Sequence, residues 1–240
     1  MIPVEKQPEP RPPGFDFDAR VRQRGQSALA ELMGRAPTIR RPGPAIAKRV
    51  ERLEDLDPQT LRDYAYWTHA LDALYGAYRG ICAYSCFRIS PLGSPTVDHF
   101  VAITSAKLAD AYEWDNYRLA CSLMNSCKRE FPDVLDPFVI QDGWFVLDVD
   151  TLEVEPAPGL APELRERIAH TIARLKLNSR ECTLTRRRYF DLYWNPPDPT
   201  RPVPLWFLAE EAPFLVREMR RQGRVRPEDL PGPPERPAAP

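Results

Sequence analysis

The stretch "VDHFVAITSAKLADAYEWDNYRLACSLMNSCK", residues 97–128, sets one of the chain's three histidines directly after an aspartate. The pair, Asp98 and His99, lies in an apolar run that predicts a strand over 95–103. Neighbouring side chains on a strand point to opposite faces. Asp98 and His99 can therefore serve one site if the strand ends or twists at this point.

Three further polar residues follow: Asn116, Asn125 and Lys128. The pattern of 116–131 predicts a helix, on which Asn125 and Lys128 share a face. A carboxylate and an amide carbonyl are hard oxygen ligands for a divalent ion, and a neutral imidazole can take a proton from water. The set favours metal-assisted hydrolysis of a phosphodiester. Each residue alone has a structural alternative, since asparagines commonly cap helices or lie exposed on them.

Together with "CAYSC" at 82–86, this stretch resembles the HNH (ββα-metal) endonucleases. Their pattern runs Cys-x-x-Cys, then Asp-His on a strand, then Asn-aliphatic before a helix, then Cys-x-x-Cys-Asn-x-x-Lys. The matching segments here are "VDHF", "NYRLAC" and "CSLMNSCK", within about residues 80–150. With "TIARLKLNSRECTLTRRR" downstream, the chain is most similar to HNH subunits encoded beside ATPases in bacterial antiphage systems.

The resemblance implies a role for each matched residue. His99 would be the general base, Asp98 and Asn125 would bind Mg²⁺ (or Mn²⁺), Asn116 would brace the loop that holds the histidine, and Lys128 would meet phosphate. The implied fold class is α+β: a mainly helical chain around a small ββα-metal (HNH) core, with proline-rich extended termini.

The cysteines depart from the family pattern, in which two Cys-x-x-Cys pairs hold a structural zinc. The first pair is Cys82-x-x-x-Cys86, and Met124 stands three residues after Cys121. On one helix, Cys121 and Cys127 would lie roughly 120° apart. We therefore expect no structural zinc, with the sulfur side chains packed as small apolar groups. A remodelled zinc site at Cys82, Cys86, Cys121 and Cys127 is the alternative.

Composition limits the remaining possibilities. The net charge of −1 over 240 residues gives no global basic character, but arginines cluster within 165–188 and 217–226, as solvated helix faces or a phosphate-facing surface. No apolar run approaches the ~20 residues of a membrane span, and no signal-peptide pattern begins the chain. These features predict a cytoplasmic protein that does not bind a membrane. No phosphate-binding glycine loop is present, so any use of ATP would come from a partner.

The 28 prolines gather toward the two ends and suggest five segments. These are a partner-binding or disordered arm (1–45), a helical segment packing on the core (46–80), the nuclease core (81–150), a helical extension (151–228) and a disordered tail (229–240). Helices are predicted over 18–33, 45–53, 57–80, 161–176, 184–193 and 206–222. Strands are predicted over 81–90 and 95–103 and in "GWFVLDVD" at 143–150.

The sequence thus predicts a Mg²⁺-dependent endonuclease acting on DNA, as the effector subunit of a defence complex. The expected partners are DNA and a protein, with an ATPase subunit as the candidate. Two alternatives remain: a catalytically inactive HNH-like scaffold or binding module, and an RNase or toxin using the same site.

Overall fold

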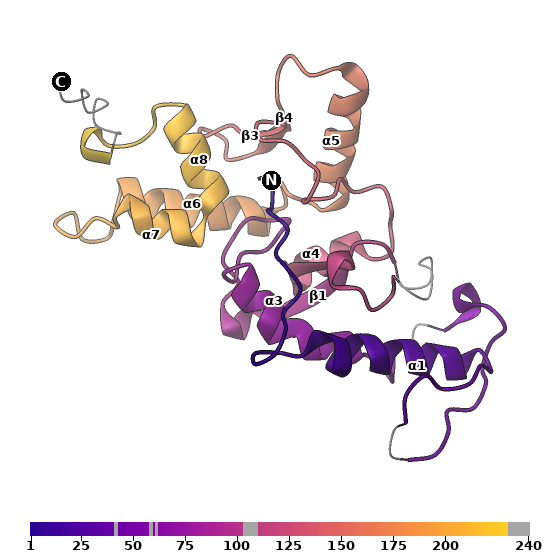
Figure 1. Cartoon of the computed structure of the whole chain (residues 1–240). Helices are drawn as coiled ribbons and strands as arrows, with labels where there is room; N and C mark the ends of the chain where they lie inside the picture. Colours follow the sequence, from indigo (N-terminus) through magenta and orange to yellow (C-terminus); the bar gives the residue numbers. More distant parts are fainter. Residues whose placement is uncertain (41–42, 58–59, 61, 103–109, 230–240) are drawn as a thin grey trace, which may run out of the picture.

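The structure, a computed structural model, describes residues 1–40, 43–57, 60, 62–102 and 110–229. At its centre β1 (Pro95–His99) and β2 (Tyr117–Cys121) form an antiparallel pair, and α4 (Ser122–Lys128) follows β2 without a linker (Figure 1). The register sets His99 opposite Tyr117. The described chain combines this β–β–α unit with a majority of helices, so it is a helix-dominated α+β protein, as predicted.

The predicted helix over 116–131 is wrong for residues 117–121, which form β2. Arginine, leucine and alanine in "YRLAC" favour a helix by intrinsic propensity, and a short apolar run is ambiguous between helix and strand. Pairing with β1 decides the outcome, and both faces of the segment are buried: Tyr117 and Leu119 on one, Arg118 and Ala120 on the other. Asn116 ends a short 3₁₀ turn (Trp114–Asn116) before β2.

The predicted helix over 18–33 is confirmed as a π-helical turn, Asp18–Arg22, continuing into α1 (Gln23–Leu32). The prediction over 45–53 is wrong. Residues 45–50 have no regular secondary structure, and the Arg49 and Val50 amides donate to the carbonyl of Leu32 at the end of α1. These amides thus supply hydrogen-bond donors to the C-terminal end of α1, and the segment does not form a helix of its own. A 3₁₀ turn follows at Leu53–Asp55.

The predicted helix over 57–80 is shorter than expected, and 58–59 and 61 lie outside the described residues. A 3₁₀ segment (Tyr66–Ala70) leads into α3 (Leu71–Ala77). The carbonyl of Tyr64 accepts hydrogen bonds from the Tyr66 amide and the Tyr112 hydroxyl, so it serves no helical donor four residues on. The interruption lets Trp67 pack against His99 and Tyr112.

Residues 81–90 do not pair with β1 as a strand. Ile81 and Arg88 form an isolated bridge, and between them the Cys82 amide donates to Phe87 and the Cys86 amide to Cys82, closing a turn. We call residues 82–86 the cysteine turn. The strand predicted over 95–103 is confirmed at 95–99, preceded by a 3₁₀ turn at Pro91–Gly93.

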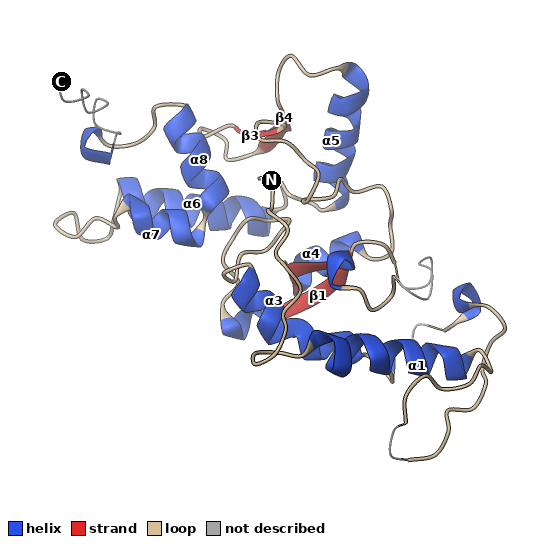
Figure 2. Cartoon of the chain, in the orientation of Figure 1, coloured by secondary structure: helices blue, strands red, loops and turns tan. Residues whose placement is uncertain are grey.

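The C-terminal half contains a second antiparallel pair, β3 (Phe145–Leu147) and β4 (Val154–Pro156), and four helices (Figure 2). The helices are α5 (Pro162–Arg174), α6 (Arg180–Trp194), α7 (Leu205–Glu211) and α8 (Pro213–Arg221), before a 3₁₀ turn at Pro227–Asp229. The strand in 143–150 and the helices over 161–176 and 184–193 are confirmed. The single helix predicted over 206–222 breaks at Ala212, whose ψ of 63° is non-helical because a proline follows it.

The N-terminal arm packs on the core instead of extending away from it. The Val4 amide donates to Pro137, and the indole of Trp114 donates to the carbonyl of Gln7. Arg22 forms ion pairs with Glu9 and with Glu113, just before β2. The arm thus contacts the domain and contains α1, so the expectation of an extended segment is wrong for 18–32. The tail prediction concerns 229–240, of which 230–240 lie outside the described residues.

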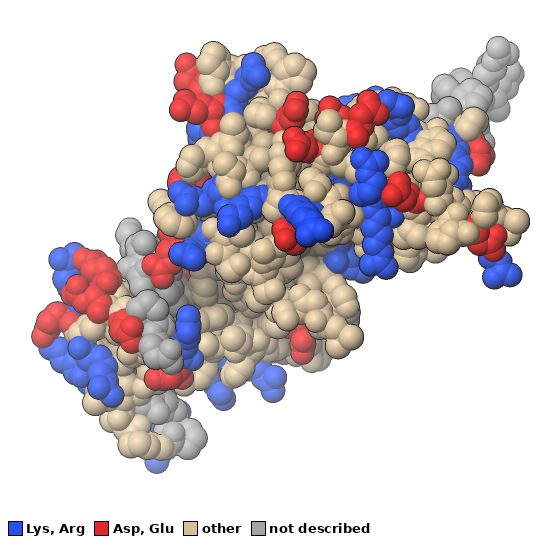
Figure 3. Space-filling view, turned by 180° about the vertical axis from the view of Figure 1, so that it is seen from behind, with Lys and Arg blue, Asp and Glu red and all other residues tan. Residues whose placement is uncertain are grey.

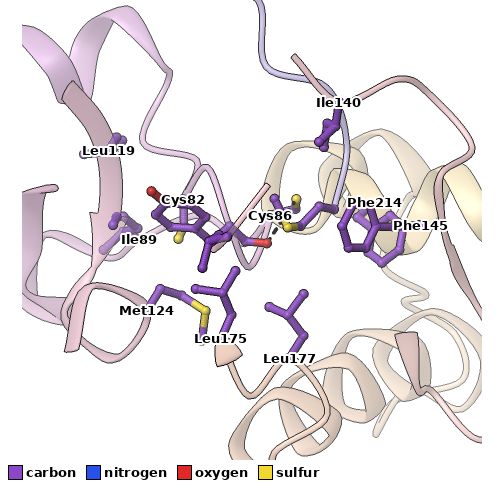
Figure 4. Packing of buried hydrophobic residues seen from close by; sticks show 14 of the residues in the cluster. Cys82, Cys86, Ile89, Leu119, Met124, Ile140, Phe145, Leu175, Leu177 and Phe214 are labelled. Atoms are coloured by element: carbon purple, nitrogen blue, oxygen red, sulfur yellow. Dashed lines mark hydrogen bonds between the residues drawn. The ribbon is translucent and has the colours of Figure 1, made fainter. Parts of the chain in front are cut away.

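One apolar cluster joins the central unit to the C-terminal helices. Figure 4 shows Cys82, Ile89, Leu119 and Met124 on one side of the cluster, and Phe145 and Phe214 on the other. Cys86 lies between the two groups. The position of the cysteine turn therefore depends on packing against both halves of the chain. None of the described helices has the length and apolar character to cross a membrane.

Candidate active site at the β–β–α unit

His99 is the last residue of β1, and its half-buried ring lies against two aromatic residues. The ring centroids of Trp67 and Tyr117 are 5.0 and 5.1 Å away, both edge-on. The Nε2 atom is 3.0 Å from the carbonyl oxygen of Ala111, an acceptor, so Nε2 carries the proton. Burial lowers the pKa of His99 to about 4, and the imidazole is neutral at pH 7. The arrangement leaves the lone pair of Nδ1 as the basic position.

Asn116 clamps the chain just beyond His99. Its Oδ1 accepts from the Val101 amide at 2.8 Å, and its Nδ2 donates to the Val101 carbonyl at 2.9 Å. The Phe100 amide donates to the Asn116 carbonyl at 2.9 Å, and Nδ2 also reaches the carbonyl of Asp110 at 3.3 Å. Asn116 thereby holds both ends of the segment that joins β1 to β2. This is the position expected of a brace for the histidine.

Asp98 points to the other face of β1 and is 2% exposed. The hydroxyl of Tyr84, from the cysteine turn, donates to Oδ2 at 2.5 Å, and the ammonium of Lys128 lies 3.4 Å from Oδ1. Burial raises the pKa of Asp98 to about 6, against the opposing effects of Lys128 and Tyr84. The loss of hydration therefore outweighs the stabilisation that Lys128 and Tyr84 give to the ionised carboxylate.

Lys128, at the end of α4, is completely buried. Its Nζ donates to the His99 carbonyl at 2.7 Å, besides its longer contact with Asp98. Such burial does not fit direct contact with a phosphate, which was the sequence-based expectation. The geometry instead makes Lys128 a positioning residue that ties α4 to the end of β1.

Asn125 and Lys128 share a face of α4, as predicted, and this face meets β1. Its Nδ2 donates to Thr96 Oγ1 at 3.0 Å, so its Oδ1 is the atom left to accept or to bind an ion. Thr96 and Asp98 are two residues apart on β1 and share a face. Asn125 and Asp98 therefore belong to the same side of the unit.

The predicted residues form two groups on opposite faces of β1. Asp98, Asn125 and Lys128 meet the face covered by α4, whereas the His99 ring faces Trp67 and Tyr117. Within the described ranges, no hydrogen bond joins the His99 imidazole to the side chains of Asp98, Asn116 or Asn125. The two groups are linked through the hydrogen bond that Lys128 donates to the backbone carbonyl of His99.

The ligand oxygen atoms on the α4 side of β1 are of the type that binds a hard cation such as Mg²⁺. One carboxylate and one free amide oxygen are the ligands that such an ion prefers. The under-compensated burial of Asp98 also favours an added positive charge. Lys128 would compete with the ion for Oδ1 of Asp98.

Other acidic residues near the unit have partners. Asp136 forms a two-bond ion pair with the buried Arg118, at 2.8 and 2.7 Å. Asp133 pairs with Arg174 at 3.1 Å and contacts His170 at 3.3 Å. These contacts favour structural roles for both aspartates over an extension of a metal site.

Sequence reasoning missed Tyr84, Trp67 and the carbonyl of Ala111. Tyr84 lies inside the quoted "CAYSC" motif, yet no local pattern connects it to a carboxylate 14 positions away. Trp67 lies within the predicted helix over 57–80, and nothing in the local sequence indicates that its ring packs against His99. A backbone carbonyl such as that of Ala111 has no signature in a sequence.

All five cysteines are free thiols. Cys82 and Cys86 are fully buried, Cys121 and Cys127 partly so, and the sulfur atoms of Cys82 and Cys121 are 4.0 Å apart. Among the described residues, no three histidine, cysteine or acidic side chains are grouped so that they could hold a metal ion.

Basic side chains are exposed on the C-terminal helices. Figure 3 shows lysine and arginine side chains across the side opposite to that of Figure 1, with aspartate and glutamate side chains among them. The exposed basic residues of α5, α6 and the turn between them are Arg165, Arg167, Lys176, Arg180, Arg187 and Arg188. Their charge complements a phosphodiester backbone.

No protein-family model matches the sequence, and no curated protein matches it significantly.

Proposed function

We propose that this protein is a metal-dependent endonuclease of the HNH type that hydrolyses DNA, with His99 as general base. The observation that carries the proposal is the His99–Ala111 hydrogen bond at the strand end of a β–β–α unit. A ring that donates through Nε2 to a fixed carbonyl keeps Nδ1 unprotonated, which is the form a general base requires.

Each residue contributes a separate part of the reaction. His99 Nδ1 takes the proton from the attacking water, and Asn116 keeps the segment after His99 in place. Asp98 and Asn125 would hold Mg²⁺ or Mn²⁺. When bound, the ion supplies charge stabilisation at the phosphate and at the departing oxygen. Lys128 fixes α4 against β1, so that Asn125 is presented on the same side as Asp98.

The exposed basic side chains of α5, α6 and the turn between them support a nucleic acid as substrate. We further propose a cytoplasmic location and a role as the effector of a bacterial defence complex with an ATPase subunit, which rest on the sequence resemblance. Co-purification with a candidate ATPase tests that partnership. Parallel assays on RNA test the RNase alternative.

The direct test incubates the purified chain with supercoiled plasmid and Mg²⁺. We expect nicked or linear product, lost in EDTA and in His99→Ala. The exposed His170 provides a matched control, because His170→Ala removes a histidine outside the unit and should keep the activity. Cleavage that survives in His99→Ala would remove the histidine from the mechanism.

A second candidate, an inactive binding module, is favoured by one observation. Both oxygens of Asp98 already have neighbours, Tyr84 and Lys128, and the carboxylate is 2% exposed. A melting experiment separates the two proposals without an activity assay. For a nuclease, Mg²⁺ should raise the melting temperature of the wild type but not of Asn125→Ala. Absence of any shift in the wild type would favour the binding module.

A further inference from the structure

Two cysteines from distant parts of the sequence lie close together in the structure. Cys82 opens the cysteine turn, and Cys121 is the last residue of β2. Their sulfur atoms are 4.0 Å apart although the residues are 39 positions apart in the sequence. A disulfide requires about 2.05 Å between sulfurs, so the two must approach by about 2 Å. The backbone already holds the segments together, because the Ala83 amide donates to the Leu119 carbonyl at 2.8 Å.

The two thiols differ in their surroundings. Cys82 is fully buried, and its sulfur accepts from the Ser85 and Cys121 amides, each at 3.5 Å. Burial raises the pKa of Cys82, but these donors and the Cys121 thiol more than offset it, so the pKa lies below the ordinary value of a thiol. Cys121 is partly exposed and lines an apolar cavity of about 210 Å³. A small oxidant can therefore reach the pair from the cavity.

We propose that Cys82 and Cys121 are an oxidation site, at which hydrogen peroxide oxidises the two thiols to an intramolecular disulfide. One sulfur of the pair, as thiolate, attacks a peroxide oxygen; the O–O bond breaks, and the departing hydroxide takes a proton to become water. The sulfenic acid so formed is attacked by the second sulfur. That sulfur loses its proton, the S–O bond breaks, and a second water leaves. Two thiols and one peroxide thus yield one disulfide and two waters.

The bond would join the elements that hold Asp98. Cys82 belongs to the turn that carries Tyr84, and Cys121 directly precedes α4, which carries Lys128. Closing a loop between residues this far apart restricts the unfolded chain. The oxidised protein should therefore unfold at a higher temperature, by on the order of 5 to 10 °C.

The test treats the reduced full chain with equimolar hydrogen peroxide, blocks free thiols and maps the peptides without reduction. We expect a Cys82–Cys121 linked peptide, the rise in melting temperature, and reversal of both by dithiothreitol. Cys127→Ser serves as the matched control, because Cys127 is also partly buried and should be dispensable. Cys121→Ser should lose both the link and the shift.

Other products of the same treatment would overturn the proposal. Cys182 lines the same cavity as Cys121, so a Cys121–Cys182 link would assign the site to a different pair. A link through Cys127, a cross-link between chains, or oxidation of Cys121 beyond the sulfenic acid without any link would refute it as well. The peptide map of the wild type decides among these outcomes, so the proposal remains testable if Cys121→Ser does not fold. The result is independent of nuclease activity.

Discussion

The ammonium of Lys128 lies 2.7 Å from the carbonyl oxygen of His99, fully buried between the end of α4 and the end of β1. The hydrogen bond joins the helix that carries Asn125 to the residue that carries the proposed base. Lys128 also approaches Asp98, so one side chain touches both members of the Asp-His pair. The buried ammonium of Lys128 therefore fixes α4 and the end of β1 relative to each other.

Tyr84→Phe tests whether Asp98 depends on the cysteine turn. The change removes the donor to Oδ2 and leaves a buried acceptor with one neighbour fewer, so it should lower the free energy of unfolding by about 1 to 3 kcal/mol. Urea denaturation measures the loss. Tyr75→Phe is the matched control, because the Tyr75 hydroxyl donates to the neutral carbonyl of Ile89. It should cost less, about 0.5 to 1.5 kcal/mol. Equal losses would show that the charge of Asp98 is unimportant to the Tyr84 contact.

Asn116→Ala tests the clamp on the segment after His99. Loss of the two bonds to Val101 should speed hydrogen exchange at the Val101 amide and reduce any cleavage activity. Asn178 makes the same two-bond clamp on Val154, at 2.7 and 2.9 Å, away from the β–β–α unit. Asn178→Ala should therefore cost comparable stability while activity is retained. Equal loss of activity in both variants would attribute the effect of Asn116→Ala to folding alone.

The site residues differ in how far sequence could predict them. The shared face of Asn125 and Lys128 follows from three-residue spacing on a helix, and the structure confirms it. That Asn125 and Asp98 lie on one side of the unit was implied by the family resemblance alone, because the local pattern assigned 117–121 to the same helix and not to the strand that pairs with β1. Local propensity does not encode this pairing.

The contacts of His99 show the same limit. The position of His99 at a strand end was one condition derived from the sequence, and β1 does end there. The partner of Nε2 is a backbone carbonyl 12 positions away, and the ring packs against Trp67 from a segment expected to be continuously helical. Both contacts arise from tertiary packing, which interrupts the helix at Ala65.

Arg118→Ala tests the assignment of Asp136 to structure. Arg118 is 3% exposed and pairs with Asp136 through two bonds, so its loss leaves a partly buried carboxylate without a counter-charge. We expect a cost of about 3 to 5 kcal/mol in urea denaturation. Arg224→Ala, which breaks the exposed pair with Asp150, should cost less than about 1 kcal/mol. A small effect of Arg118→Ala would instead leave Asp136 available for other roles.

The pH dependence of stability should separate Asp98 from His99. The folded pKa of Asp98, about 6, exceeds its unfolded value near 3.8, so the folded state binds more protons between these values. The stability that Asp98 contributes is therefore present below pH 3.8 and lost as the pH rises through 6. His99 has the opposite sign. Its folded pKa of about 4 lies below 6.5, so its contribution is present above pH 6.5 and lost as the pH falls through 4.

The two contributions oppose each other between pH 4 and 6. The stability of the wild type should therefore show neither pH dependence clearly. In Asp98→Asn the stability relative to the wild type should rise from pH 4 to pH 6.5, by on the order of 2 to 3 kcal/mol at 1.4 kcal/mol per pKa unit. In His99→Phe the stability relative to the wild type should rise as the pH falls from 6.5 to 4. Urea denaturation of the three proteins at four pH values measures these slopes. Carboxylates elsewhere cancel in the differences from the wild type. A flat difference for Asp98→Asn would mean that this carboxylate is solvated in solution, and the buried Tyr84–Asp98–Lys128 arrangement would then be wrong.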